Sequence, residues 1–350
     1  MIIQELKISH LRNLTSVNIE LSAGINLITG PNASGKSSLI EAAYLLGRGK
    51  TFRESRQENI IQDGQQQATI FAKMLSNKRE TIGLIQKRKG IDISINGNRE
   101  SKVSILADHF PLNLITPKTY EIIECGPEYR RRLLDWAVFH VEPKYKNIVS
   151  SYLKLVRERN QLLKSDHSLL PHWEQSLEKQ ADIINRYRSG YLEKLTLHFS
   201  DILGYYSDMP DIKLKYQQGS DPSLSLSKVL QQKRGDDILR GFTTAGPHRA
   251  DLKILVNRKA AKSRLSRGQQ KIATVALILA QVKLLNNLTG KQSLLLIDDL
   301  AAELDITNRE TTLALLRDMG IQVLVTATSK SLVPLREDER VFHVEQGIVG

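Results

Sequence analysis

Apolar and polar residues alternate along the first thirty positions of the chain and again from about residue 69 to residue 104. Alternation with a period of two is typical of strands that bury one face only. Asn96 and Gly97 interrupt the second alternating region with a dipeptide that favours a tight hairpin turn. The pattern therefore predicts a small antiparallel sheet beside a main sheet.

Three short runs are apolar without alternation, which is typical of strands buried on both faces. They occupy residues 25–30, 292–298 and 321–328. Segments with helical periodicity lie beside them at residues 35–47, 269–287 and 307–319. Alternating buried strands and helices indicate a parallel sheet that is covered by helices on both faces.

The middle of the chain, from about residue 127 to residue 204, is charged and helical in pattern. Apolar side chains recur there on one helix face, at Leu177, Ala181, Ile184, Tyr191, Leu195 and Phe199. The segment supports two or three helices folded back on each other. Residues 217–227 are interpreted as a linker, and residues 250–257 as a strand with which the α/β pattern resumes. We therefore expect an α/β fold with one lobe at 1–118 and 240–350, and a helical lobe inserted at 119–239.

Lysine and arginine total 50 against 38 acidic residues among 350, which gives a net charge of +12. A surplus of this size indicates an anionic partner such as nucleic acid, although a basic proteome background would also produce it. The single Cys125 fits a reducing cytosol. We expect a soluble cytoplasmic protein without a membrane partner, because the start of the chain lacks an apolar signal core and Gln281 and Lys283 interrupt the longest apolar run.

A phosphate-binding loop is predicted at Gly30–Ser37, which reads GPNASGKS and lies between a buried strand and a helix. The loop comprises Gly30, Pro31, Asn32, Ala33, Ser34, Gly35, Lys36 and Ser37. Its backbone N–H groups would surround a nucleotide β-phosphate, with Lys36 on the β- and γ-phosphates and Ser37 on Mg²⁺. The alternative is a glycine-rich turn without a ligand.

Two acidic residues, Asp298 and Asp299, follow the apolar run at Leu294–Ile297. Ligands of parallel α/β sheets bind at the carboxyl ends of strands, so Asp298 is the candidate acid for the metal. Asp299 could orient an attacking water. The alternative is a pair of acids that cap a helix.

A second anion-binding loop is indicated by LSRGQQK, which contains Ser266 and Gly268 at the entrance of a long helix. Arg264, Arg267 and Lys271 add positive charge. Two such loops for one nucleotide make sense if each copy of a two-fold dimer lends this loop to the phosphate loop of its partner.

The phosphate loop, SRGQQ, LLLIDD and LAAELD together resemble the ATP-binding-cassette (ABC) head, and LKISHLRNL, GPEYRRRLLDWAVFHVEP and GPHRADL resemble the RecF family of bacterial recombination mediators, related to SMC-type heads. The resemblance implies that Ser266, Gly268 and Gln269 form the signature loop and that Asp305 lies in the loop that crosses a dimer interface. Asp299 stands where many cassette ATPases have Glu, which implies slow hydrolysis. Thr326 or Thr328 stands near the switch histidine of transporters, and Asn113 roughly at the Q-loop glutamine.

The resemblance further implies a weak, DNA-stimulated ATPase that acts as a switch: an ATP-induced homodimer clamps DNA at gaps or stalled forks and works with RecR, with RecO and RecA downstream. Two groups of basic residues are candidate DNA contacts. The first is Arg130, Arg131 and Arg132, which could instead be a solvated face. The second is Arg48, Lys50, Arg53 and Arg56, which could instead cap a helix. Two other functions remain open. A transporter ATPase subunit would carry a Glu after Asp298 and a switch histidine, and a nuclease would need a second acidic metal cluster.

Overall fold

The computed structural model describes residues 2–53, 57–75, 79–165 and 167–350. The chain divides into two compact units. The first comprises the chain up to Thr119 together with Leu285–Gly350, and the second comprises Tyr120–Leu284. We describe each unit by itself.

An antiparallel sheet of six strands occupies the N-terminal part of the first unit, in the order β2-β1-β4-β5-β6-β7. The strands are β1 (Ile2–Leu11), β2 (Leu14–Glu20), β4 (Gln67–Leu75), β5 (Arg79–Lys87), β6 (Ile91–Ile95) and β7 (Asn98–Glu100). Asn96 and Gly97 join β6 to β7 with φ of 52° and 81°. These positive angles are those of the tight hairpin that the sequence predicts.

A second sheet of the first unit has the order β15-β14-β3-β13-β12-β8. Its strands are β3 (Ile25–Thr29), β8 (Leu112–Ile115), β12 (Leu294–Ile297), β13 (Val323–Ala327), β14 (Arg340–Glu345) and β15 (Ile348–Val349). All pairs are parallel except β14 with β15. The three apolar runs thus form the adjacent strands β3, β13 and β12, which confirms the prediction of a buried parallel sheet.

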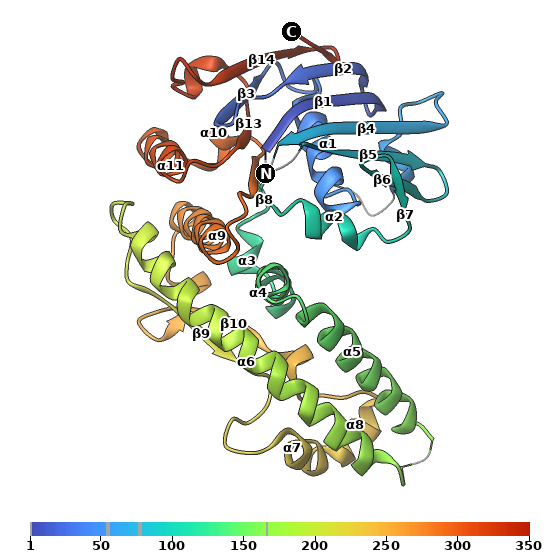
Figure 1. Ribbon diagram of the computed structural model, residues 1–350. Helices are drawn as coiled ribbons and strands as arrows, with labels where there is room; N and C mark the ends of the chain where they lie inside the picture. The colour runs from blue at the N-terminus through green and yellow to red at the C-terminus, as the bar shows by residue number, and fades with distance from the viewer. Residues whose placement is uncertain (1, 54–56, 76–78, 166) are drawn as a thin grey trace. The chain divides into compact units, whose positions relative to one another are not determined.

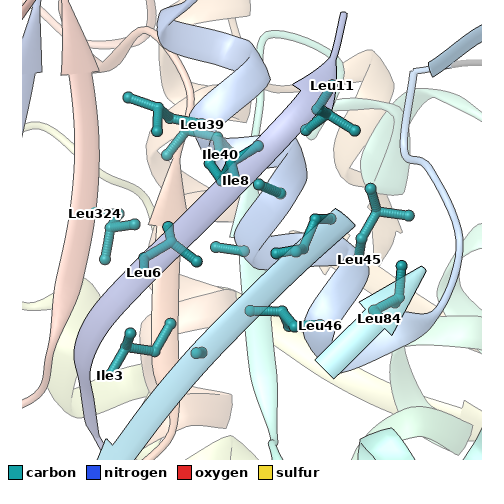
Figure 2. Packing of buried hydrophobic residues seen from close by; sticks show 14 of the residues in the cluster. Ile3, Leu6, Ile8, Leu11, Leu39, Ile40, Leu45, Leu46, Leu84 and Leu324 are labelled. Carbon is teal, nitrogen blue, oxygen red and sulfur yellow. The ribbon is translucent and has the colours of Figure 1, made fainter. Parts of the chain in front are cut away.

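The core of the first unit gathers around α1 (Lys36–Arg48), which packs apolar side chains against both sheets (Figure 2). Leu39, Ile40, Leu45 and Leu46 of this helix are fully buried. They meet side chains of the antiparallel strands and Leu324 of β13. The remaining helical segments of the unit are η1 (Gln57–Ile60), α2 (Ser104–His109), α10 (Leu300–Glu303), α11 (Ile306–Asp318) and η4 (Lys330–Leu332).

The second unit is built on α4 (Pro127–Val141), α5 (Tyr145–Leu162) and the long α6 (Leu170–Leu203) (Figure 1). The six apolar residues predicted to share one helix face are all buried on α6. The other elements are α3 (Glu121–Glu124), β9 (Ile212–Gln217), α7 (Leu226–Gln232), α8 (Arg234–Arg240), η2 (Pro247–Arg249), β10 (Asp251–Val256), β11 (Lys259–Ala260), η3 (Ala261–Ser263) and α9 (Arg267–Thr289).

The strand expected at residues 250–257 is present as β10, but it does not belong to the parallel sheet. It pairs antiparallel with β9 and β11 in a small sheet of the second unit. Its alternating burial distinguishes it from the fully buried β12 and β13. The second unit accordingly extends to Leu284, whereas the expected lobe boundary lies at residue 239.

Helix α9 is long and apolar enough to cross a membrane by length and composition. The expectation that Gln281 and Lys283 make this run too short for a span is therefore wrong by that criterion. Of its apolar 18-residue window, 72% is buried inside the protein, and the core helix of a soluble protein meets the same criterion.

Candidate functional site

The phosphate-binding loop connects β3 to α1, and two glycines give it its shape. Gly30 has φ of +148°, and a Cβ there would lie 2.1 Å from the Val344 carbonyl oxygen. Gly35, with φ of +122°, is the residue from which α1 begins. At Gly30 the backbone angle and the Val344 carbonyl both exclude a side chain, whereas at Gly35 it is the backbone angle that favours glycine.

Lys36 is the first residue of α1, and its Nζ donates hydrogen bonds to the carbonyl oxygens of Gly30 (2.8 Å) and Pro31 (2.7 Å). Burial lowers the pKa of Lys36, while the nearby carboxylates Asp299 and Asp298 act in the opposite direction. The ammonium group thus lies over the loop between the backbone and two acids, where it can bind an anion.

One of the two acids after β12, Asp298, is bonded to the phosphate loop. Ser37 Oγ donates a hydrogen bond of 2.8 Å to Asp298 Oδ1. Thr326, at 1% exposure, donates to the same oxygen at 2.9 Å and accepts a hydrogen bond of 2.8 Å from the Asp299 backbone N–H. Asp299 itself has a left-handed backbone, with φ of 58°. Non-glycine residues in this conformation concentrate at functional sites.

A hydroxyl and a carboxylate oxygen at this distance, beside Lys36, are the donors that a nucleotide-bound Mg²⁺ takes in P-loop proteins. Ser37 and Asp298 therefore fit the expected metal. Among the described residues, no group of three or more His, Cys, Asp or Glu could hold a metal ion.

A cavity of about 840 Å³ opens beside the loop and is lined by Lys36, Ser37, Arg12, Asn13 and Arg53, among others. Arg12 is held there by two hydrogen bonds, of 3.0 and 3.1 Å, to the carboxylate of the buried Glu41. Neither Arg12 nor Asn13 was predicted from the sequence as a site residue, although both belong to the segment LKISHLRNL that resembles the RecF family.

Asn13 braces the phosphate loop from the turn between β1 and β2. Its Nδ2 donates to the Ala33 carbonyl oxygen at 3.2 Å, and its Oδ1 accepts from Ser38 Oγ at 3.0 Å. A Cβ at Gly35 would lie 3.2 Å from the Asn13 side chain. The antiparallel sheet thereby helps to position the nucleotide loop.

The signature loop belongs to the second unit, where Ser266 and Gln269 close the start of α9. Ser266 Oγ accepts from the Gln269 N–H at 3.2 Å, and Gln269 Oε1 accepts from the Ser266 N–H at 3.1 Å. This reciprocal pair is a capping box. A Cβ on Gly268 would meet only Ser266 Oγ, at 4.0 Å. Packing within the chain therefore does not require glycine at this position.

Asp305 caps α11 in the first unit. Its Oδ1 accepts from the Asn308 backbone N–H at 2.9 Å, and its Oδ2 accepts from Asn308 Nδ2 at 2.6 Å. These hydrogen bonds lower the pKa of Asp305. Ile306, the next residue, is 71% exposed, so an apolar side chain faces solvent beside the predicted interface residue.

The three arginines at the start of α4 have different environments. Arg130 donates to both Asp251 oxygens, at 2.8 and 3.1 Å, and to two backbone carbonyls. Arg131 donates to the Ala250 carbonyl oxygen at 2.7 Å. Arg132 pairs with Glu128 on the surface and is 72% exposed. Arg130 thus anchors α4 to β10, and a DNA contact stays a prediction that Arg132 fits best.

The basic residues at and after the end of α1 also differ in their environments. The Arg48 guanidinium donates to the Leu112 carbonyl oxygen, and burial lowers its pKa to about 10, which points to an internal role. Lys50 is exposed, and Arg53 lines the cavity beside the phosphate loop. Arg56 lies outside the described residues. Lys50 and Arg53 stay predicted DNA contacts, although Arg53 is also placed where it could contact a bound nucleotide.

Two further assignments by resemblance can be located. Thr326 bonds to Asp298, whereas Thr328 is exposed after the end of β13. Asn113 lies within β8 opposite Leu295, before the strand end at which Ile115 accepts from the Asp298 N–H. Asn113 thus lies two residues before the end of β8, and its equivalence to a Q-loop residue stays a prediction.

The first unit joins a P-loop after β3 to an acid after β12 of the same sheet, and the second presents a capped signature loop. These features define an ATPase head of the ABC and SMC type. A solved Smc head shares the fold, with a TM-score of 0.63 at 17% identity over 100% of this chain and 96% of that one. The chain matches the family described as RecF/RecN/SMC N terminal domain over residues 2–349. Within it, the chain belongs to the RecF family of DNA replication and repair proteins.

The comparisons cover nearly the whole chain. RecF of Shewanella frigidimarina and RecF of Shewanella pealeana are each 35% identical over 356 residues, which span 100% of this chain and 99% of theirs. A solved structure of the recombination mediator RecF with ATP, in the RecFOR pathway, has a TM-score of 0.88 at 29% identity and covers 99% of this chain and 96% of that one. Family membership decides against the transporter subunit that the sequence left open.

Proposed function

We propose that this protein is an ATP-controlled DNA clamp of recombinational repair and replication. Two copies would close around ATP at a gap or a stalled fork and, with RecO and RecR, promote loading of RecA on single-stranded DNA. The Gly30–Ser37 loop of each copy would bind one ATP, and the Ser266–Gln269 loop of the other copy would complete the pocket. The relatives named RecF and the solved RecF with ATP support this proposal.

The observation that carries the proposal is the open space at Gly268. Gly268 is the second residue of α9, where alanine is the better helix former. Among the described residues nothing packs closely enough to require glycine, so an external group that approaches closely would account for it. The capping box uses Ser266 Oγ as an acceptor and leaves its O–H to donate to a phosphate.

Within one copy, the loop N–H groups and Lys36 would hold the phosphates. Ser37 and Asp298 would hold Mg²⁺, which neutralises phosphate charge when bound. Asp299 would orient the attacking water. Its side chain is one methylene shorter than that of Glu, so we expect slow hydrolysis that serves as a switch.

ATP would bind the closed dimer better than the open monomer, and therefore shift the equilibrium towards closure. Loss of the γ-phosphate would remove the bridge between the two copies. The surplus of 50 basic over 38 acidic residues supports an interaction with the DNA backbone across a groove in the closed dimer.

Light scattering after size-exclusion chromatography, with and without ATP and Mg²⁺, tests the proposal. We expect ATP to dimerise the wild-type protein but neither Lys36→Arg nor Ser266→Arg. Ser263→Arg is the matched control, since Ser263 is exposed three residues before Ser266 and bonds to a backbone carbonyl oxygen. Normal dimers of Ser266→Arg would refute the assignment of this loop.

A further inference from the structure

One side of the antiparallel sheet packs on α1, and the other carries a straight row of residues across five strands. The register places Lys7 of β1 opposite Phe71 of β4, Phe71 opposite Gly83 of β5, Gly83 opposite Ser94 of β6, and Ser94 opposite Arg99 of β7. We call these five residues the outer row. Their neighbours in the same strands face α1 and are buried, namely Leu6, Ile70, Leu84 and Ile93.

The aromatic ring of Phe71 lies near the centre of the outer row. Phe71 is partly exposed, and its cross-strand neighbour Gly83 has no side chain to cover the ring. A Cβ on Gly83 would lie 2.6 Å from Ser94 Oγ, so even alanine would crowd the row. A shallow cavity of about 360 Å³ follows this surface and is lined by Phe71, Gly83, Ser94 and Arg99, with Ile85 beside them.

Basic side chains lie on both sides of Phe71, and they outnumber the acidic side chains with which they pair. Glu5 is shared by Lys7 (3.0 Å) and Lys73 (2.6 Å). At the other end, Asp92 is shared by Lys87 (2.6 Å) and Arg99 (2.8 Å), so that four cations face two carboxylates.

The four cationic side chains remain 47–81% exposed, which leaves them accessible to a further anion. At the corners of the face, Arg79 adds one charge and Glu20 subtracts one. In the first unit, no helix among the described residues lies over this side of β1, β4 and β5 in Figure 1. The face is therefore open, positively charged and aromatic at its centre.

We propose that this face binds a single strand of nucleic acid, with an unstacked base on the Phe71 ring and backbone phosphates at the two cation pairs. Stacking on an aromatic ring between cations is how single strands are held without regard to sequence. At about 4.8 Å between strands, the row spans roughly 19 Å, enough for a few nucleotides. A duplex keeps its bases stacked and cannot reach the ring. The inference rests on the proposed function for its choice of DNA as the partner.

Fluorescence anisotropy of labelled oligothymidylate and of a labelled duplex, with the full-length protein, tests the inference. Phe71→Leu keeps apolar bulk and removes the aromatic ring. We expect it to weaken binding of the single strand about tenfold and to leave the duplex unchanged. Ile85→Val, on the same face without an aromatic ring, is the matched control. Because the face lies within one copy, the loss should also appear in a Lys36→Arg background.

A second variant, Lys7→Gln with Arg99→Gln, keeps the test valid if Phe71→Leu folds poorly. It should reduce the slope of log K against log salt by about 1.4 for the single strand. Unchanged single-strand binding by both variants would overturn the inference and leave the clamp intact. Wild-type protein that binds no DNA even with ATP would instead overturn the proposed function. An acidic peptide that loses binding with Phe71→Leu, while oligothymidylate does not, would reassign the face to a protein partner and overturn the inference.

Discussion

At the scale of single residues, Thr326 links the two acids of the nucleotide site. Its hydroxyl donates to Asp298 and accepts from the Asp299 backbone, which keeps both acids in place beside Ser37. The resemblance located Thr326 only as one of two residues near a switch position. Its actual partners directly follow the adjacent strand β12, and Asp298 lies 28 residues earlier in the chain.

Thr326→Val should therefore weaken both the site and the fold. The substitution is close in shape but leaves the part-buried Asp299 N–H without its acceptor, at a cost of about 1 kcal/mol in the free energy of unfolding. ATP affinity in Mg²⁺ should fall with it. Urea unfolding and a nucleotide titration measure the two effects, and Thr328→Val, on the exposed residue nearby, should change neither.

Gly268→Ala should have opposite effects on the stability of the fold and on ATP-driven dimerisation. Alanine fits the open space and is the better helix former, so we expect the free energy of unfolding to stay the same or rise by up to about 1 kcal/mol. ATP-driven dimerisation should nevertheless fall, because the methyl group would occupy the approach of the partner's nucleotide. A variant that dimerises as tightly as the wild type would remove the main support for a contact in trans.

The positions of single residues could be predicted where the elements that hold them are close in sequence or share a sheet edge, while their binding roles stay predictions. Gly30–Ser37 could be found because strand, loop and helix are consecutive, and the Asp298–Ser37 pairing because the carboxyl ends of parallel strands share an edge. Arg130 shows the limit. Its partner Asp251 is 121 residues away, and a run of three arginines does not reveal which member is buried.

At the scale of elements, buried polar groups lock the second unit. Arg188 of α6 bonds to Asp135 of α4 and to the Pro247 carbonyl oxygen. His248 of η2 takes a hydrogen bond from Tyr152 of α5 at 2.7 Å and donates to the Thr243 carbonyl oxygen at 3.0 Å. Burial lowers the pKa of His248 to about 4, with Arg249 and Arg131 acting in the same direction, so the ring is neutral in the folded protein.

Stability should consequently fall as the pH falls from 7 to 5. The unfolded chain protonates its histidine near pH 6.5, while folded His248 does not until about pH 4, so the unfolded state binds more protons in this window. We expect His248 to contribute a loss of about 2 kcal/mol between pH 7 and pH 5. Urea unfolding at both pH values should show a smaller loss in His248→Gln, whereas His172→Gln, at an exposed position of α6, should behave as the wild type.

Elements were predictable where burial is one-sided or complete. The fully buried runs gave β3, β12 and β13, and the apolar face of α6 was read from its spacing. The sheet to which β10 belongs could not be predicted. A half-buried strand shows the same alternation in any sheet, and the sequence of its partner β9 did not indicate a strand. The expected linker at residues 217–227 overlaps only the first two residues of α7, and the rest of α7 and all of α8 lie in a segment for which no element was predicted.

At the scale of the whole molecule, the surplus of positive charge predicts strong dependence on salt. If about six phosphates are neutralised, duplex affinity should fall on the order of a thousandfold between 50 and 200 mM salt. Anisotropy titrations on gapped DNA with ATP measure the slope. Arg132→Gln should reduce it by about 0.9, while Arg130→Gln should lower the free energy of unfolding instead. A response that is flat with salt would contradict binding to the DNA backbone.

The central claim is that each nucleotide is shared by two copies, and mixing two inactive variants tests it most directly. Lys36→Arg lacks a working phosphate loop and Ser266→Arg lacks a working signature loop, but a mixed dimer has one site with both parts intact. The account predicts that neither variant dimerises with ATP alone, and that the mixture regains ATP-dependent heterodimers, measured by light scattering with one variant tagged. If the mixture with ATP behaves as the sum of its separate components, the shared site is contradicted.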